Sequence, residues 1–259
     1  MRSVLITGCS SGIGKACVDL FSKKGWHVIA TMRSLHPHEW PLNVRVLQLD
    51  VTDKESIEKA IKKAGQIDVL VNNAGMSVVG AIESSSKYQI EEIFDTNVFG
   101  LVEVTKAVVP QMRERNKGVV INISSTVGKS VSALSGYYCA TKHAVEAISE
   151  ALWHELSRTN VKVKIIEPGF TKSSLHNKGK KSDIIVPFYD KKIDDKIRRL
   201  KEITHCASAL SVARCIYNAA TDGKRKLRYQ PDYQSKKKIL KSKYVPDYFL
   251  LKEANKKYR

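Results

Sequence analysis

Residues 3–14 decide the fold of this chain and read Ser3-Val4-Leu5-Ile6-Thr7-Gly8-Cys9-Ser10-Ser11-Gly12-Ile13-Gly14. A short apolar run typical of a strand leads into a glycine-rich turn, and residues 15–24 continue as an amphipathic helix. Glycines let the backbone approach a pyrophosphate, and the start of a helix attracts the anion, so this order predicts a dinucleotide-binding loop. The spacing G-x-x-x-G-x-G differs from G-x-G-x-x-G, and an ordinary tight turn is the alternative interpretation.

The alternation of strand and helix continues along the chain. Apolar runs predict strands at residues 4–7, 27–31, 44–49, 69–72, 119–123 and 161–167, with a last short strand at 226–229. Helical periodicity predicts helices at residues 13–24, 54–63, 88–99 running on through 101–115, 137–157 and 208–221. This pattern indicates an α/β fold, a doubly wound parallel sheet of Rossmann type with about seven strands and helices on both faces. One continuous pattern over 259 residues favours a single domain.

Two segments depart from the alternation. Residues 173–205, the predicted lid segment, follow the end of a strand, where ligands bind in such sheets. They are predicted to cover the substrate, and a solvated insertion is the alternative. Residues 231–259 form a basic C-terminal extension.

Tyr138 and Lys142 lie four residues apart in a predicted helix, so their side chains share one face. A phenol has a pKa of about 10 and is a poor proton shuttle at neutral pH, but a nearby positive charge lowers that value. A hydroxyl such as that of Ser125 could hold a carbonyl substrate beside the phenol. The pattern favours proton transfer to or from an oxygen, although this spacing is also common on solvated helices.

Five motifs occur in order: Thr7-Gly8-x-x-x-Gly12-Ile13-Gly14, Asn72-Asn73-Ala74-Gly75, Asn97, Ser125 and Tyr138-x-x-x-Lys142. With them the chain resembles the short-chain dehydrogenase/reductase family, and most of all its steroid and retinol dehydrogenase branch. The resemblance implies an oxidoreductase that interconverts a ketone or aldehyde and an alcohol.

The resemblance also implies a role for each of four residues. Tyr138 transfers the proton, and Lys142 lowers the pKa of Tyr138 and binds the nicotinamide ribose. Ser125 holds the substrate oxygen, and Asn97 holds a water that links Lys142 to solvent. Neighbouring residues of the same types, Tyr137 and Ser124, are predicted to serve in packing or local hydrogen bonds, with Ser124 facing away from the site.

The cofactor is predicted from the end of the second strand, which lacks an acidic residue and is followed by Arg33. Arginine can bind a 2′-phosphate, so NADP(H) is preferred over NAD(H), and a solvated Arg33 is the alternative. The resemblance places the cofactor against Gly8, Ser10, Ser11, Gly12, Ile13, Gly14, Arg33, Asp50, Val51, Asn73, Ala74, Gly75, Tyr138, Lys142, Pro168, Gly169, Thr171 and Ser173.

An apolar set of residues is expected around the substrate beside Ser125 and Tyr138: Val78, Val79, Thr126, Val127, Leu134, Phe170, Leu175 and Phe188. The set carries no charge, so a lipophilic substrate is predicted and an acidic one is disfavoured, although lysines of the lid segment such as Lys172 could reach in. The alternative is that these residues are ordinary core. The family resemblance further implies a homodimer or homotetramer.

Composition bounds the remaining expectations. The net charge is +18, with many basic residues in 172–201 and 224–259. The C-terminal extension is predicted to pack on the domain, with peripheral membrane contact as a weaker alternative and nucleic-acid binding weaker still. Five cysteines without ligand spacing predict free thiols and no metal site. Without an expected leader or spanning helix, a cytoplasmic location is predicted.

A non-catalytic NADP(H)-sensing or scaffold protein on the same fold is the alternative function. Such proteins usually lose the tyrosine or the lysine, and here Asn97, Ser125, Tyr138 and Lys142 are all present.

Overall fold

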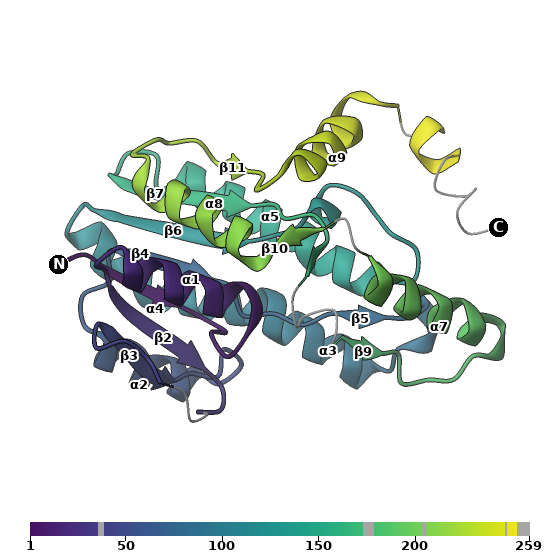
Figure 1. Ribbon diagram of the computed structural model, residues 1–259, viewed down its shortest axis with the longest axis horizontal. Coiled ribbons are helices and arrows are strands. Elements are labelled where there is room, and N and C mark those ends of the chain that lie inside the picture. Colours follow the sequence, from purple (N-terminus) through teal and green to yellow (C-terminus); the bar gives the residue numbers. More distant parts are fainter. Residues whose placement is uncertain (36–38, 173–178, 204–205, 247, 253–259) are drawn as a thin grey trace.

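A parallel sheet of seven strands forms the centre of the computed structural model, which describes residues 1–35, 39–172, 179–203, 206–246 and 248–252 (Figure 1). The spatial order is β11-β7-β6-β4-β1-β2-β3. The strands are β1 (Ser3–Ile6), β2 (His27–Met32), β3 (Val44–Gln48), β4 (Val69–Asn72), β6 (Gly118–Ile123), β7 (Val161–Ile166) and β11 (Arg228–Tyr229). The predicted doubly wound parallel sheet is confirmed.

Helices cover both faces of this sheet (Figure 1). On one face α1 (Gly12–Lys23) and α8 (Ala209–Thr221) share a core with Val4 and Ile6. On the other face α2 (Lys54–Ala64), α4 (Gly100–Glu114) and the end of α5 (Gly136–Glu155) share a core with Leu5. Successive residues of β1 are therefore buried on opposite faces, as a parallel sheet covered on both sides requires.

The chain changes direction across the sheet between β1 and β4. From β1 it proceeds to β2 and β3 on one side, and from β4 it proceeds to β6, β7 and β11 on the other. Ligands bind at such a switch point, outside the carboxyl ends of the strands. The loops after β1 and β4 meet there, since a Cβ added to Gly8 would lie 2.8 Å from the Cα of Ala74.

The helix predicted to run through residues 88–115 contains a wider turn. It comprises α3 (Lys87–Phe94), the π-helical turn η2 (Asp95–Phe99) and α4. Single π-helical turns of this kind are frequent at functional sites, because the extra residue redirects the side chains of the turn.

Smaller elements lie around the carboxyl ends of the strands. They are β5 (Val78–Val79) paired with β9 (Lys180–Lys181), β8 (Thr171–Lys172) paired with β10 (Ala207–Ser208), η1 (Ile82–Ser84), η3 (Thr126–Gly128), α7 (Pro187–Glu202) and α9 (Tyr233–Tyr244). The sequence did not predict the two-residue strands, which are too short for a periodic signal. Among the described residues, no helix is both long and apolar enough to cross a membrane.

Candidate active site

The glycine loop follows β1 and leads into α1. Gly8 and Gly12 have φ angles of 71° and 60°, in the left-handed region where glycine is free of the Cβ clash. The Asn73 side chain fixes the loop by donating to the carbonyl of Thr7 at 2.8 Å and to that of Gly8 at 3.1 Å. The loop and the end of β4 therefore form one rigid cradle at the start of α1.

One cavity of about 620 Å³ extends from this cradle along the carboxyl ends of the strands. Most residues predicted for the cofactor line it: Gly8, Ser10, Ser11, Gly12, Ile13, Arg33, Asp50, Val51, Asn73, Ala74, Gly75, Tyr138, Lys142, Pro168, Gly169 and Thr171. Gly14 does not line the cavity, because it packs under the loop, where a Cβ would overlap the Gly8 carbonyl. Ser173 and Leu175 lie outside the described residues.

The end of the cavity that contains the glycine loop is called the nucleotide end, and the end beyond Tyr138 is called the substrate end. Segments that follow β2 and β3 form the far wall of the nucleotide end. Arg33 is exposed at the rim, just past β2, and its carbonyl accepts from the Gln48 amide at 3.2 Å. Asp50 follows β3 and accepts from both the backbone N–H and the hydroxyl of Thr52, at 3.0 and 2.8 Å. The Asp50 carboxylate thus shapes the turn before α2, while the Arg33 guanidinium belongs to an exposed side chain that can meet a ligand at the rim.

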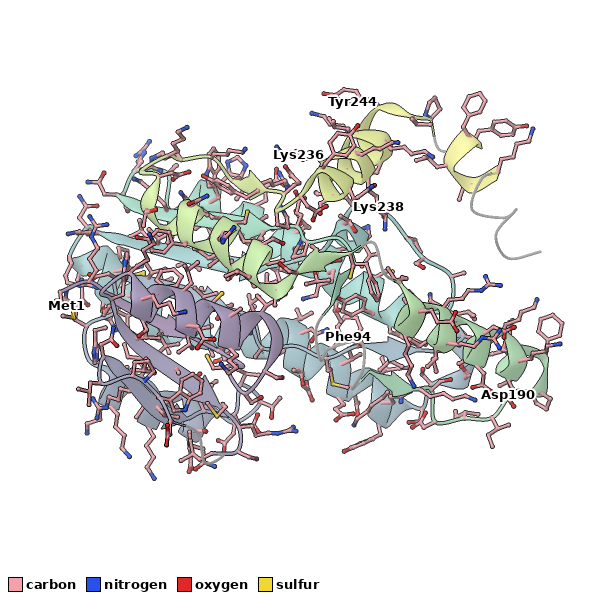
Figure 2. The ribbon with its side chains drawn as sticks, viewed as in Figure 1. Met1, Phe94, Asp190, Lys236, Lys238 and Tyr244 are labelled. Carbon is pink, nitrogen blue, oxygen red and sulfur yellow. The ribbon has the colours of Figure 1, made fainter. Side chains whose placement is uncertain are left out.

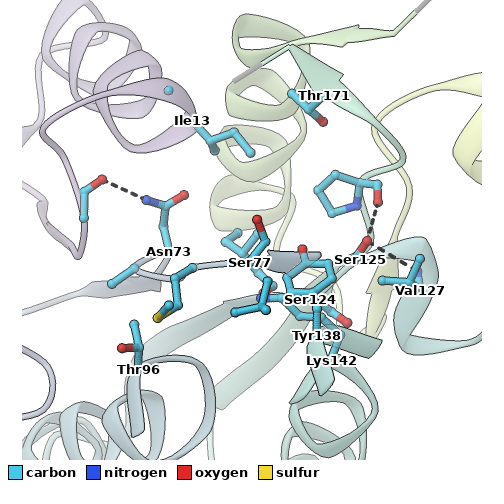
Figure 3. Close-up of a pocket in the computed structure, with 18 of the residues that line it drawn as sticks. Ile13, Asn73, Ser77, Thr96, Ser124, Ser125, Val127, Tyr138, Lys142 and Thr171 are labelled. Carbon is cyan, nitrogen blue, oxygen red and sulfur yellow. Dashed lines mark hydrogen bonds between the residues drawn. The ribbon is translucent and has the colours of Figure 1, made fainter. Parts of the chain in front are cut away.

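Ser125, Tyr138 and Lys142 lie together on one wall of the cavity, and Ile13 and Asn73 lie on the opposite side (Figure 3). Ser125 follows β6, and its hydroxyl donates to the Pro168 carbonyl and accepts from the Val127 N–H, both at 3.3 Å. Its hydroxyl also forms a hydrogen bond with the Tyr138 phenol. The sequence motif therefore becomes a cluster in space through the ends of β6 and β7 and the first turns of α5.

The electrostatics of this cluster differ from the sequence expectation. Burial raises the pKa of the Tyr138 phenol above its usual value, and the Ser125 hydrogen bond opposes this only in part. Burial also lowers the pKa of the Lys142 ammonium to about 8. The ammonium donates to the Ile123 carbonyl at 2.9 Å and lies 5.8 Å from the centre of the Tyr138 ring. The lowering of the Tyr138 pKa by Lys142 stays a prediction.

Asn97 lies in the π-helical turn and is buried. Its amide donates to the Met76 carbonyl at 2.9 Å and to the Thr141 hydroxyl at 3.1 Å, and its oxygen accepts from the Met76 N–H at 2.8 Å. Asn97 thus ties the loop after β4 to α5 next to Lys142, although it does not itself line the cavity. The water that the resemblance assigns to Asn97 stays a prediction.

Tyr137 and Ser124 lie differently relative to the cavity. The Tyr137 hydroxyl donates to the Ile82 carbonyl at 3.1 Å, outside the cavity lining, in keeping with a local structural role. Ser124 belongs to the cavity lining beside Ser125, but its hydroxyl is buried against η3, where a Cβ added to Gly128 would lie 2.7 Å from it. The orientation is consistent with the expectation that the two serines do not both face the site.

The substrate end contains part of the predicted apolar set. Val78, Val79, Thr126, Val127 and Phe170 line the cavity, whereas Leu134 and Phe188 do not. The Leu134 carbonyl instead accepts from the Gly80 N–H at 3.0 Å, and the Phe188 side chain is 71% exposed. These two residues were assigned from loop positions that the sequence could not orient.

Charged residues that the sequence did not assign also line the substrate end. They are Glu92, Lys180, Lys196 and Lys238. Lys238 comes from α9, which is anchored at the site because the Ser235 hydroxyl accepts from the Gly169 N–H at 2.9 Å. Lys180 and Lys196 belong to the lid segment, from which lysines were expected to reach in, whereas Glu92 and Lys238 were not expected at the cavity. Only the run of lysines in the extension hinted at α9, and sequence alone could not place it.

Comparison with known proteins agrees with this fold and site. A family model described as short chain dehydrogenase matches residues 2–183, and the chain belongs to that family. An uncharacterised oxidoreductase of Schizosaccharomyces pombe is 44% identical over 216 residues, which cover 80% of this chain and 90% of that protein. Retinol dehydrogenase 7 of Mus musculus is 33% identical over 96% of this chain and 86% of its own length. The chain is thus a member of the retinol dehydrogenase-like branch.

Solved structures give the same assignment. A short-chain dehydrogenase from Streptomyces avermitilis superposes with a TM-score of 0.83 at 33% identity, covering 92% of this chain and 90% of that one. A serine dehydrogenase complexed with NADP+ has a TM-score of 0.78 at 32% identity, covering 88% and 94%. The protein is an oxidoreductase of alcohol and carbonyl groups that uses a nicotinamide nucleotide.

Proposed function

We propose that this protein is an NADP(H)-dependent oxidoreductase that interconverts a lipophilic ketone or aldehyde and its alcohol, with Tyr138 as the proton-transferring group. One observation carries the proposal. Ser125, Tyr138 and Lys142 line the same cavity as the glycine cradle, so a nucleotide and a carbonyl compound can meet at the phenol.

The residues present fit a nicotinamide dinucleotide. A Cβ at Gly8 would lie 2.8 Å from the Cα of Ala74, so the glycine loop is held against the end of β4. Gly8 and Gly12 line the cavity without a side chain, which permits the close backbone approach that a pyrophosphate requires. The first turn of α1 contains no acidic residue that would repel the anion. When bound, the nucleotide supplies or accepts the hydride. The chain's own residues orient the carbonyl and exchange the proton.

The preference for NADP(H) is supported by the charge at the far rim of the cavity. Arg33 follows β2 where an NAD-binding protein usually carries an acidic residue for the ribose 2′-hydroxyl. Among the relatives of known structure, the serine dehydrogenase binds NADP+. A guanidinium can form charge-assisted hydrogen bonds with a 2′-phosphate, which the non-phosphorylated nucleotide lacks.

The lipophilic substrate is supported by the apolar part of the substrate end and by the resemblance to retinol dehydrogenases. In the proposed reduction, Ser125 donates to the substrate oxygen and Tyr138 gives its proton to that oxygen. Lys142 stabilises the phenolate that remains. The predicted lid segment excludes water through α7 while this transfer takes place.

The decisive test is Tyr138→Phe, with Tyr137→Phe as the matched control one residue away. The Tyr138 variant should keep NADPH binding and lose turnover of any accepted carbonyl by roughly 10²–10⁴-fold, because general acid–base catalysis is removed. The control should keep both, since the Tyr137 hydroxyl bonds the Ile82 carbonyl outside the cavity. NADPH oxidation followed by absorbance over a panel of ketones and aldehydes measures this.

A non-catalytic nucleotide-sensing role is the alternative, and the same panel distinguishes it. Tight NADPH binding without turnover of any member of the panel would favour the sensor. Equal turnover by the wild type and Tyr138→Phe would instead remove Tyr138 from the mechanism.

We further propose a homodimer or homotetramer. The α3–α4 helix exposes two large aromatic side chains, Tyr88 at 72% and Phe99 at 58%. Light scattering at micromolar concentration should give at least twice the monomer mass of 29.0 kDa, and a monomer would overturn this proposal.

A further inference from the structure

Two lysines from different helices meet at the substrate end of the cavity. Lys196 comes from α7 and Lys238 from α9, and both line the cavity together with Ser132 and Ser135. Both ammonium charges also act on the Cys139 thiol, which places them around the same part of α5. Figure 2 shows Lys238 on α9 near the body of the fold. These helices are distant in sequence, and the fold brings their positive charges to one wall.

The Lys196 ammonium is surrounded by neutral oxygens. It donates to the Ser135 hydroxyl at 2.8 Å, to the Ser132 hydroxyl at 3.2 Å and to the Ala133 carbonyl. Ser135 is the N-cap residue of α5, three residues before Tyr138, or about 5 Å along the helix axis. Lys196 therefore lies at the start of the helix that also carries Tyr138 and Lys142.

Two other lysines of the lid segment have carboxylate partners. Lys180 pairs with Glu92 at 2.6 Å, and Lys181 pairs with Asp194 at 2.7 Å. Within the described part of the chain, no carboxylate lies within ion-pair distance of the Lys196 ammonium. Glu92 also lines the cavity, but its charge is already matched by Lys180. The three N–H groups of the Lys196 ammonium are met by neutral oxygens, so an anionic ligand oxygen would take the place of one of them.

The arrangement makes it harder to keep Lys196 protonated. Burial lowers the pKa of its ammonium to about 8, and the like charge of Lys238 lowers it further while the Cys139 thiol opposes the decrease. Two cations at one partly buried wall repel each other, and an anion between them lowers both the repulsion and the cost of burial. A purely structural role for Lys196, fixing α7 to residues 132–135, does not account for the second lysine, Lys238, at the same cavity.

We propose that Lys196 and Lys238 bind an anionic oxygen group of the substrate, a carboxylate or a phosphate carried on an apolar chain. This inference rests on the proposed function and names the substrate class of the same site. The phosphates of the nucleotide are assigned to a separate place. Their cradle and Arg33 follow β1 and β2, whereas Lys196 and Lys238 come from α7 and α9. The apolar residues Val79, Val127 and Phe170 accommodate the chain that joins the anionic group to the reacting carbon.

The test measures binding without turnover. Protein saturated with NADP+, so that the nucleotide phosphate sites are filled, is titrated calorimetrically with decanoate, decyl phosphate or 1-decanol below their micelle-forming concentrations. We expect at least one of the two anions to bind about tenfold or more tightly than the alcohol, because a charge-assisted hydrogen bond is stronger than a neutral one. The stronger of the two anions identifies carboxylate or phosphate as the natural group.

Three variants complete the test. Lys196→Met should weaken the affinity for the preferred anion about tenfold and leave the affinity for 1-decanol unchanged. Lys238→Met, on a different helix, should also weaken the affinity for the anion. Lys191→Met, which removes an exposed lysine from the same helix as Lys196, is the matched control and should change neither. If Lys196→Met does not fold, the Lys238 variant carries the same comparison.

Equal affinity for decanoate, decyl phosphate and 1-decanol in the wild type would overturn the inference, as would unchanged anion affinity in both lysine variants. Failure here is separate from failure of the proposed function. The latter shows as absent NADPH-dependent turnover of neutral ketones by the wild type, which the binding titration does not measure.

Discussion

The two ends of the active-site cavity are built in different ways. The nucleotide end consists mainly of main chain and small residues that follow β1 and β4, with Gly8 and Ala74 in close approach. The substrate end consists of side chains from β5, η3, α5, α7 and α9 and from the loop after β7, with Lys196 and Lys238 among them. The first is rigid because its backbone is fixed to the sheet, and the second depends on how separate helices dock.

This difference separates two kinds of sensitivity. A backbone cradle tolerates no added atom, because the backbone itself would have to move. A wall of long side chains can lose one side chain and keep its shape. Substitutions there should therefore change which substrates bind more than they change the stability of the fold. Substitutions in the cradle should therefore have larger effects than substitutions in the side-chain wall.

Gly14→Ala should have the largest effect. A Cβ at Gly14 would overlap the Gly8 carbonyl oxygen and lie 2.7 Å from the Asn73 amide nitrogen, so the loop must shift. We expect NADPH affinity to fall by about 100-fold or more and stability by about 1–3 kcal/mol, as for overpacking in a core. Calorimetric titration and denaturant unfolding measure the two effects.

Gly65→Ala is the control for this substitution. Gly65 has a φ of 71° with no atom within 4 Å of an added Cβ. Its replacement should cost about 1–2 kcal/mol of stability through backbone strain and leave NADPH affinity unchanged. Wild-type NADPH affinity in Gly14→Ala would show that the cradle is not rigid.

Lys142 lies at the junction of the two ends, and its burial predicts a pH-dependent stability. The residue is 6% exposed, and burial lowers the pKa of its ammonium from the usual 10.5 to about 8. Between these values the unfolded chain binds more protons than the folded one, so stability rises with pH. Below pH 8 the charge is buried at full cost.

Lys142→Met removes that cost together with the catalytic group. At pH 7 the variant should be more stable than the wild type, and this advantage should shrink by about 2–3 kcal/mol by pH 10.5. Denaturant unfolding of the nucleotide-free proteins at a series of pH values measures it. Lys106→Met, which removes an exposed lysine from α4, should show no such change. A constant difference between Lys142→Met and the wild type at all pH values would refute the argument.

The contrast between the two ends also explains what the sequence could predict. The strand–glycine–helix order gave the doubly wound sheet, and the cradle residues follow from it because they are neighbours in sequence or end adjacent strands. Ser125, Tyr138 and Lys142 are likewise brought together by β6 and one helix, and the cavity contains all three. The sequence could not place Leu134, Phe188 or Lys238, because their positions depend on loops and helices without periodic signals near the sheet.

Arg33→Gln tests the one long side chain at the rim of the nucleotide end. We expect NADPH affinity to fall about tenfold while NADH affinity stays the same, because only the phosphorylated ribose meets the guanidinium. Arg45→Gln is the control, since the Arg45 guanidinium donates to the Lys63 carbonyl at 2.8 Å, away from the cavity. Equal losses for NADPH and NADH would show that Arg33 does not read the 2′-phosphate.

The smallest effect is expected where the lid segment joins α3. The exposed Asp183 carboxylate accepts from the Ser86 N–H at 2.8 Å and from its hydroxyl at 2.5 Å, at the N-cap of α3. The Gln89 amide donates to the Lys181 carbonyl at 2.9 Å, and the Lys180–Glu92 ion pair adds a third connection. When one of these exposed contacts is removed, the other two still hold the lid segment to α3.

Asp183→Asn should raise KM for the best carbonyl substrate by about two- to fivefold with kcat unchanged, because exposed charged contacts contribute little singly. Asp195→Asn is the matched control, since that carboxylate pairs with Arg198 within α7 at 2.7 Å and does not reach α3. Steady-state kinetics with NADPH measures both. A loss of kcat as large as that of Tyr138→Phe would contradict the contrast drawn here, because the substrate end would then be as intolerant of a single change as the cradle.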